Sequence, residues 1–274
     1  MPSMQSAKVL SAFHDLVNKA NPHDPITRYD NYASGPIVCF TYLQKLGIQA
    51  IAVNLVYTKT PENPRKWPEY WDRSSFKPLW RLWSTCKVRS LKSACDEMNM
   101  LNPPGRRQVF GTTTIKNDPA TIQAAHNVYK STITLIKREN IEGMSWTLVL
   151  QPILPDWVHK GDANPMGLYS TVDEPLILVN FTVNWAKHED DELVEKLTRE
   201  AIEKIDAFAA ANGTAHQYRY MNYCGAWQKP FEGYGGENLK FLQHVSRKYD
   251  PDGLFQRGCM GGFKLNIANK EGLI

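Results

Sequence analysis

The sequence has no long hydrophobic run and no strong excess of either charge. No stretch reaches the ~18 to 20 apolar residues that a membrane-spanning helix needs, so we expect no membrane span. The 274 residues include 32 Lys and Arg and 28 Asp and Glu, a formal charge of +4, and the basic residues are spread along the chain. Because no basic stripe is present, a nucleic-acid partner is not expected.

Cysteine pairs are also missing. The five cysteines are far apart, with no C-x-x-C pair and no histidine at metal-ligand spacing. An odd, scattered set is typical of a reducing compartment, so we expect a cytoplasmic protein without a metal site. In the first 21 residues, Val9, Phe13 and Val17 recur at helical spacing among polar residues. This pattern predicts an amphipathic helix and not a secretory signal.

No run of Pro, Gly and Ser divides the chain, so with 42% hydrophobic residues it predicts one domain over residues 1–274. Strands and helices alternate irregularly, which favours an α+β fold: an antiparallel β-sheet with helices packed on one face and an open face that forms a pocket. The predicted strands are 36–43, 49–58, 79–89, 105–116, 144–154 and 175–185. The predicted helices are 1–21, 90–100, 118–138 and 190–211, with Ser90 and Asp118 as N-caps and Gly213 ending the last one.

One face of the predicted sheet is polar but uncharged. In strand 175–185 the odd positions are apolar, whereas Asn180, Thr182 and Asn184 share the opposite face. The same division recurs in strand 144–154 and, more weakly, in strand 105–116. A solvated face is the alternative, since many antiparallel sheets have one. Such a face usually carries Lys and Glu, which these strands nearly lack, so we favour a pocket.

Hydroxyl and amide side chains form hydrogen bonds without placing a charge in a dry cleft, which suits an apolar, oxygenated small-molecule substrate. The candidate catalytic residues on these strands, as orienting and polarising hydrogen-bond groups, are Gln151 and Asn180. The candidate substrate-binding residues are Gln108, Thr112, Thr147 and Thr182.

Motifs of other chemistries are missing. The sequence has no G-x-S-x-G elbow, no P-loop and no H-E-x-x-H helix. Of the seven histidines, only His159 and His216 are expected in loops beside the sheet, where either is a candidate acid or base. No cysteine has a nameable catalytic partner, so a thiol nucleophile is not expected.

Several short segments occur in a fixed order along the chain. They are Val56-Tyr57-Thr58, Asn102-Pro103, Gly105-Arg106-Arg107-Gln108-Val109-Phe110, Gln151-Pro152-Ile153, Asn184-Trp185, Tyr220-Met221-Asn222-Tyr223 and Arg247-Lys248-Tyr249-Asp250-Pro251-Asp252-Gly253-Leu254-Phe255. In this order and spacing they resemble the substrate domain of FAD-linked oxidases of the berberine-bridge type, with that family's C-terminal segment at 217–265. The likeness covers nearly the whole chain.

The resemblance implies an antiparallel sheet whose open face lies over the flavin ring. In that family a separate flavin domain supplies glycine-rich phosphate loops and the His and Cys that tether FAD. None of these motifs occurs here, so we expect a stand-alone substrate domain without a bound cofactor. The family's Tyr-x-Asn-Tyr segment approaches the flavin, and we therefore expect Tyr220 as a third catalytic residue and Asn222 as a substrate-binding residue.

The same resemblance implies a surface that a flavin domain would otherwise cover. We expect Trp227, Phe231 and Tyr234 on this exposed patch, which favours a homodimer or a local lid.

Three functions are open. The favoured one is a cofactor-independent enzyme of fungal-type natural-product biosynthesis that catalyses cyclisation or isomerisation, including pericyclic reactions of the Diels–Alder type. Positioning and a hydrogen bond to a carbonyl can drive such reactions without a charged base. The alternatives are a fragment or partner subunit of an FAD-linked oxidoreductase, completing a separate flavin domain, and a non-catalytic small-molecule-binding protein.

Overall fold

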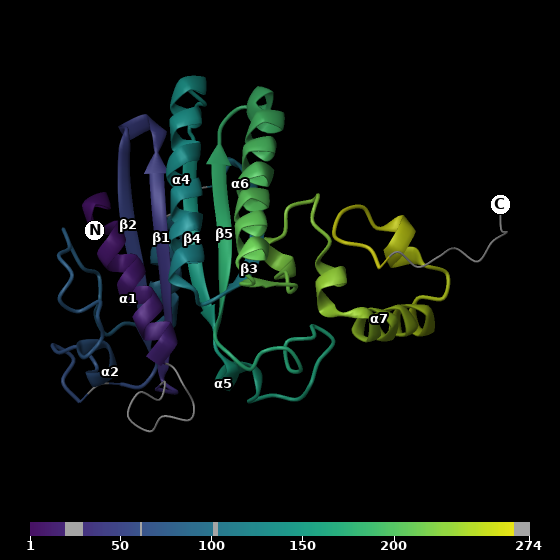
Figure 1. Cartoon of the computed structure of the whole chain (residues 1–274), viewed down its shortest axis with the longest axis horizontal. Helices are drawn as coiled ribbons and strands as arrows, with labels where there is room; N and C mark the ends of the chain where they lie inside the picture. The colour runs from purple at the N-terminus through teal and green to yellow at the C-terminus, as the bar shows by residue number, and fades with distance from the viewer. Residues whose placement is uncertain (20–29, 61, 101–103, 266–274) are drawn as a thin grey trace.

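The computed structural model describes residues 1–19, 30–60, 62–100 and 104–265. Within these residues, one six-stranded antiparallel sheet carries the helices α1, α4 and α6 on one face (Figure 1). The strands are β1 (Ala33–Leu43), β2 (Ile48–Tyr57), β3 (Arg107–Lys116), β4 (Ser145–Ile153), β5 (Leu176–Trp185) and β6 (Ala215–His216). The helices are α1 (Ser6–Lys19), α2 (Glu69–Asp72), α3 (Leu91–Met100), α4 (Pro119–Glu139), α5 (Pro155–Val158), α6 (Asp191–Ala211) and α7 (Gly236–Tyr249). The predicted α+β fold is confirmed.

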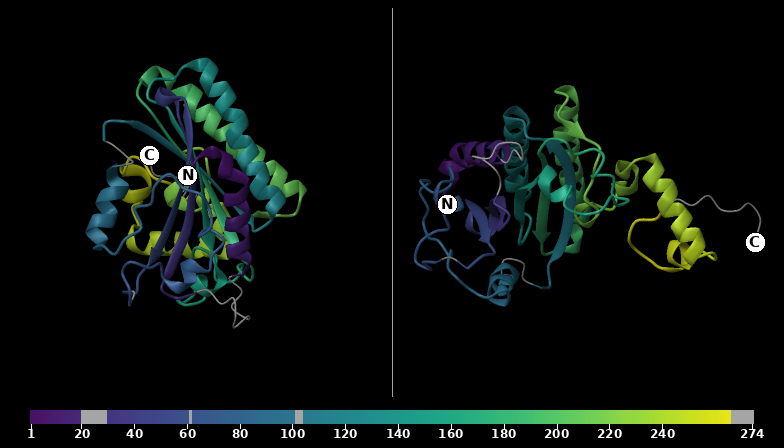
Figure 2. Two further views of the ribbon diagram at one scale, coloured as in Figure 1. Left: turned by 90° about the vertical axis from the view of Figure 1, so that its left-hand side faces the viewer. Right: turned by 90° about the horizontal axis from the view of Figure 1, so that it is seen from below.

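The strand order in the sheet is β2-β1-β4-β5-β3-β6. Figure 2, left, views the sheet nearly edge-on and shows α1, α4 and α6 on one side and α3 standing off the other. The opposite side of the sheet is therefore free of long packed helices, as the alternation of strand 175–185 predicts.

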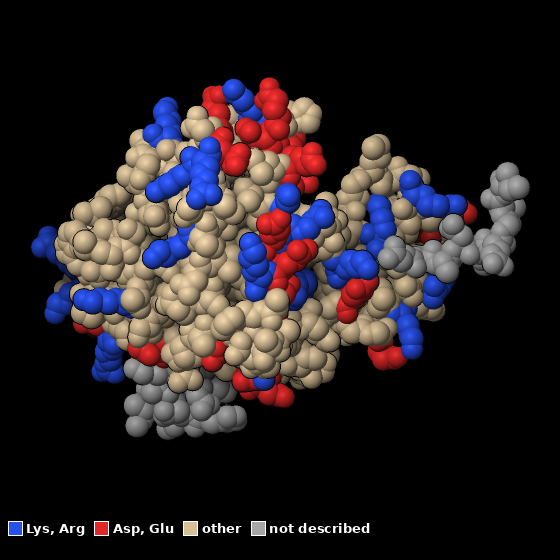
Figure 3. Space-filling model, turned by 45° about the horizontal axis from the view of Figure 1, so that its top comes forward, with Lys and Arg blue, Asp and Glu red and all other residues tan. Residues whose placement is uncertain are grey.

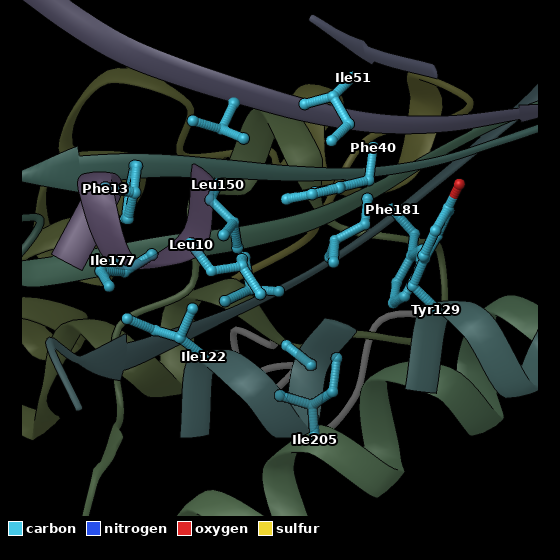
Figure 4. Packing of buried hydrophobic residues seen from close by; sticks show 14 of the residues in the cluster. Leu10, Phe13, Phe40, Ile51, Ile122, Tyr129, Leu150, Ile177, Phe181 and Ile205 are labelled. Atoms are coloured by element: carbon cyan, nitrogen blue, oxygen red, sulfur yellow. The ribbon is translucent and has the colours of Figure 1, made fainter. Parts of the chain in front are cut away.

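The apolar residues of each strand meet the helices in a continuous core (Figure 4). Phe181 on β5 is fully buried and its ring lies 4.6 Å from that of Trp146 on β4. Phe13, Ile122 and Ile205 bring α1, α4 and α6 onto this layer. Burial of each large apolar side chain contributes about 1.5–3 kcal/mol, so this face holds the fold together.

Helix α4 begins where the sequence predicts. The Asp118 carboxylate accepts hydrogen bonds from the Thr121 amide at 2.7 Å and from the Thr121 hydroxyl at 2.8 Å. The helix ends at Asn140, whose φ of 49° is left-handed. Ser90 also acts as predicted, since its hydroxyl accepts from the Ser93 amide at 3.2 Å before α3.

The predicted strand 79–89 is wrong, because these residues form an extended strap that pairs with no strand. No sheet face buries their side chains, and Trp80, Leu82 and Trp83 are 53%, 59% and 74% exposed. Thr85 and Arg89 instead bind Glu97 of α3. Two other predicted features lie outside the described residues: the end of the first helix at 20–21 and the segment Asn102-Pro103.

The C-terminal part of the chain extends away from the sheet (Figures 1 and 2). Helix α7 has no buried residue, and the turn after it is held by Asp250, which accepts from the Leu254 and Phe255 amides at 2.7 and 2.9 Å. Figure 3 shows basic and acidic side chains interspersed where this arm meets the sheet. Among the described residues, no helix combines the length and apolarity that crossing a membrane requires.

Candidate functional site

The face of the sheet opposite α1, α4 and α6, here called the polar face, is built from cross-strand rows. Because directly opposite residues in an antiparallel pair share a face, the register places polar side chains from neighbouring strands together. The rows, read from β3 through β5 and β4 to β1, are Gln108–Asn184–Ser145–Leu43, Phe110–Thr182–Thr147–Thr41 and Thr112–Asn180–Val149–Cys39, followed by Thr114–Leu178–Gln151. All fifteen positions lie within the described residues, and none of them is charged.

Asn180 and Asn184 each present a side-chain oxygen without a hydrogen-bond partner on this face. Asn180 is only 3% exposed, and its Nδ2 donates to Thr182 Oγ1 at 2.9 Å while its Oδ1 has no partner. Asn184 Oδ1 is also buried and has no hydrogen-bond partner. A buried acceptor without a donor costs about 1–3 kcal/mol, so both oxygens favour a bound group that donates hydrogen bonds.

Like Thr182, which accepts from Asn180, the other two of the three predicted threonine sites are engaged within the sheet. Thr112 is fully buried, and its hydroxyl donates to the Val179 carbonyl at 2.9 Å, which leaves it as an acceptor only. Thr147 Oγ1 donates to Thr41 Oγ1 of the next strand at 3.1 Å. Gln108, at the end of its row, is exposed.

A turn after β6 brings a further tyrosine to the polar face. The short 3-10 helix Met221–Tyr223 places the Tyr223 ring edge-on to Phe110, with centroids 5.7 Å apart. Gln151 Nε2 donates to the Tyr223 hydroxyl at 3.1 Å. Since that hydroxyl accepts this bond, its own proton remains available to a ligand. Tyr223 is absent from the predicted site, and only the Tyr-x-Asn-Tyr segment could have pointed to it.

The predicted residues Tyr220 and Asn222 occupy different environments around this turn. The Tyr220 ring packs edge-on against Tyr223 at 4.9 Å and is half-buried. Asn222 is exposed and its Nδ2 donates to the Tyr220 hydroxyl at 2.9 Å. The structure thus brings Gln151, Tyr223 and Tyr220 together, and places Asn222 at the rim.

The two candidate histidines separate clearly. His216 lies in β6 and not in a loop as predicted, directly opposite Thr114, so it extends the row that ends at Gln151. Burial lowers the pKa of His216, and its Nδ1 accepts from the Tyr218 amide at 3.2 Å, so the imidazole is neutral near pH 7. His159 is exposed after α5, with Nε2 3.1 Å from the Tyr169 carbonyl oxygen.

The thiols near this region are poor nucleophiles. Burial raises the pKa of Cys39 to about 11 and that of Cys224 to about 12, so both stay protonated at neutral pH. Within the part of the chain that the structure describes, no three His, Cys, Asp or Glu side chains are grouped to hold a metal ion.

The predicted exposed patch needs a correction. Tyr234 is only 6% exposed, because its ring stacks on Tyr218 with centroids 5.9 Å apart. Phe231 is half-buried against Tyr234, and Trp227 is half-buried beneath the Arg199 guanidinium, which lies 5.3 Å from its ring centre.

Two surface clefts lie beside the polar face, not at its centre. One, of about 410 Å³, lies between α6 and the segment 217–233, and its lining includes Asp206, Arg219 and Trp227. The other, of about 260 Å³, includes Gln108 and the ion pair of Arg107 with Asp191. Neither contains Asn180. At the polar face itself, the turn at residues 220–223 contacts Phe110 and Gln151 through Tyr223.

Comparison with known proteins agrees with this geometry, although no family model matches the chain. The FAD-dependent monooxygenase sdcF of Emericella nidulans is 32% identical over 265 residues, which cover 94% of this chain and 51% of that protein. The bifunctional solanapyrone synthase of Alternaria solani is 25% identical over 219 residues, covering 79% of this chain and 40% of that protein. The chain spans about half the length, or less, of these curated relatives.

A solved structure shows the same arrangement of strands and helices. The 6-hydroxy-D-nicotine oxidase of Arthrobacter nicotinovorans matches with a TM-score of 0.58 and 16% sequence identity, over 93% of this chain and 51% of the oxidase. The chain therefore has the fold of the substrate-binding domain of FAD-linked oxidases of the berberine-bridge type.

Proposed function

We propose that this chain binds a neutral, oxygenated and largely apolar small molecule on its polar face, as the substrate-binding part of an FAD-dependent oxidoreductase of fungal natural-product biosynthesis. The observation that carries the proposal is the set of uncharged rows with two buried, unpartnered amide oxygens. The FAD-dependent monooxygenase among the relatives supports the reaction class.

The side chains of the polar face divide the binding task between them. Asn180 and Asn184 accept hydrogen bonds from hydroxyl groups of the substrate through their free Oδ1 atoms. The Tyr223 hydroxyl, which accepts a hydrogen bond from Gln151, donates a hydrogen bond to a substrate carbonyl. Val149, which is 8% exposed, lies directly opposite Asn180 on β4 and supplies an apolar contact. Such a surface orients a substrate and polarises a carbonyl, and it has the neutral imidazole of His216 at its edge.

FAD itself is only partly matched by the described residues. The polar face fits a neutral ring system, but its rows contain no Lys or Arg to bind a pyrophosphate. Among the described residues, no glycine-rich loop joins a strand to a helix in the manner of a dinucleotide site. We therefore derive no step through FAD from these side chains, whose role in the proposal is to bind and orient the substrate.

Exposed apolar side chains favour a covering partner on the strap side of the molecule. Trp80, Leu82 and Trp83 lie on the strap that leads to α3, and the Asn54 amide of β2 contacts Met98 of α3 at 3.6 Å. As part of the proposal, a second copy of the chain or a flavin-bearing polypeptide covers this side. A light-scattering mass twice that of the chain would identify a homodimer, and a monomer mass would exclude one.

A second candidate function is cofactor-independent cyclisation or isomerisation of the same class of substrate. It is favoured by the lack of charged groups in the rows, since a hydrogen-bonding surface suffices to fold a substrate and activate a carbonyl. The likeness to a bifunctional synthase gives further support. The visible absorption spectrum of the purified protein separates the two candidates: a flavin band supports the oxidoreductase, and turnover by a colourless protein supports the cyclase.

Ligand binding can be tested with a matched pair of probes. The neutral probe is 6-acetyl-2-naphthol, which has one hydroxyl donor and one carbonyl acceptor, and 6-hydroxy-2-naphthoate has a similar ring with a negative charge. We expect the neutral naphthol to bind and the naphthoate to bind much more weakly, because the rows offer it no cation. Asn180→Leu and Gln151→Leu should each weaken binding of 6-acetyl-2-naphthol while the protein stays folded. Equal binding of both probes, or no effect of either substitution, would contradict the proposal.

A further inference from the structure

One glutamine side chain ties the segment after β6 to the edge of the sheet. Gln228 Nε2 donates to the Thr112 carbonyl at 2.7 Å, and Gln228 Oε1 accepts from the Thr112 amide at 3.0 Å. The same oxygen accepts from the Gly225 amide at 3.0 Å. Thr112 and Gly225 are buried and Gln228 is half-buried. Each of these three hydrogen bonds therefore replaces a bond that water would otherwise form.

The position of this contact explains why an amide is needed. Strand β6 pairs with β3 only at Thr114 and Ile115, so the main chain of Thr112 lies beyond the end of that pairing. A primary amide offers one donor and one acceptor side by side, as a peptide group of a neighbouring strand would. Gln228 therefore completes the edge of β3 for one residue.

The segment that Gln228 anchors is itself compact. The main-chain N–H of Gln228 donates to the Gly225 carbonyl at 2.9 Å, and this bond closes a turn. The Trp227 ring packs so closely on Gly225 that a Cβ there would lie 2.4 Å from it. Tyr223 precedes this turn by two residues and reaches Gln151 and Phe110 on the polar face. Fixing the turn at Thr112 thus fixes the approach of the tyrosine.

We propose that Gln228 is a positioning residue, whose amide holds Tyr223 over the polar face through the Thr112 and Gly225 backbone. The role of Tyr223 in substrate binding rests on the proposed function. The test of Gln228 does not, because it uses no ligand. The residue that distinguishes positioning from simple edge pairing is Gln151, because its side-chain amide binds the Tyr223 hydroxyl and does not touch Gln228.

Gln228→Glu gives a pH-dependent test. An ionised glutamate can accept from both amides but cannot donate to the Thr112 carbonyl, whereas a protonated one can. At pH 7 we expect the hydrogen-exchange protection of the Thr112 and Gly225 amides to fall roughly ten-fold. The Gln151 side-chain NMR resonances should move toward those of Tyr223→Phe. Near pH 4, at or below the ordinary pKa of a glutamate, both readouts should return part of the way toward the wild type.

Gln217→Glu is the matched control, because Gln217 lines the same 410 Å³ cleft but is exposed and makes none of these bonds. It should change neither readout at either pH. Gln228→Met, which keeps the length but removes both hydrogen-bonding atoms, should give the pH 7 changes without recovery, and serves if the glutamate variant does not fold. Loss of Thr112 and Gly225 protection with unmoved Gln151 resonances would overturn the positioning role. Unchanged protection would overturn the contact itself.

Discussion

The two faces of this sheet are made by the same strands but differ in completeness. On β5, Val179, Phe181 and Val183 point to the helices and are fully buried, while Thr182 on the other face is half-buried. The apolar side chains of the helix face pack against α1, α4 and α6 in one cluster. The polar face has two buried amide oxygens without partners. One face therefore holds the fold together, and under the proposed function the other face binds the ligand.

The largest expected effect is on the helix face. Phe181→Ala removes a fully buried ring that stacks on Trp146, and should lower the free energy of unfolding by about 3–5 kcal/mol. Thr182→Ala, one residue along on the polar face, should change it by about 1 kcal/mol or less. Denaturant unfolding measures both values, and equal losses would contradict the division between the faces.

The second effect concerns a titratable group on the helix face. His126 of α4 is 5% exposed between Phe40 and Tyr129, with ring centroids at 4.7 and 5.7 Å, and burial lowers its pKa to about 4. The unfolded chain binds a proton near pH 6.5 and the folded chain only near pH 4. Stability from this group is therefore complete above pH 6.5 and is lost as the pH falls through that window.

His126→Leu should remove this pH dependence, which amounts to about 2 kcal/mol between pH 7 and pH 5. The measurement is the difference in unfolding free energy between the two pH values for wild type and variant. His216→Gln, at the edge of the polar face, should alter that difference by less. An unchanged pH dependence in His126→Leu would show that the buried imidazole is not its source.

A third, smaller effect is expected at the start of α4. Asp118→Ala removes the carboxylate that caps Thr121, and should cost about 1 kcal/mol of stability. Asp118→Asn keeps an accepting oxygen and should lose only a fraction of that. If the alanine and asparagine variants are equally destabilised, the negative charge of Asp118, and not its hydrogen bond to the Thr121 amide, stabilises the helix.

Much of the fold could be predicted from the sequence, because strand alternation has a period of two residues and is visible locally. The face of Asn180 and Thr182 follows from it directly. The prediction of a strand at 79–89 was wrong, because no other strand pairs with this segment. Tyr223 was missed because its contact with Gln151 spans 72 residues. The engagement of the Thr112 hydroxyl by the Val179 carbonyl depends on three-dimensional register, which alternation cannot supply.

The smallest expected change in stability is at the centre of the polar face. Asn180→Leu removes one hydrogen bond to Thr182 and one unpartnered oxygen, so the two contributions nearly cancel and stability should change by less than about 1 kcal/mol. Binding of 6-acetyl-2-naphthol should nevertheless be weakened. A large loss of stability would mean that Asn180 is structural.

The most direct measurement is an NMR titration with the neutral hydroxyl-bearing probe that follows the side-chain amide resonances. The ligand here is the hydroxyl-bearing probe 6-acetyl-2-naphthol, and we expect Asn180, Asn184 and Gln151 to shift together, while Gln123 and Asn127, which bond to each other at 3.0 Å on the exposed side of α4, stay in place. Shifts confined to Gln217 in the cleft beside α6, with Asn180 unmoved, would contradict the account of the polar face as the binding site.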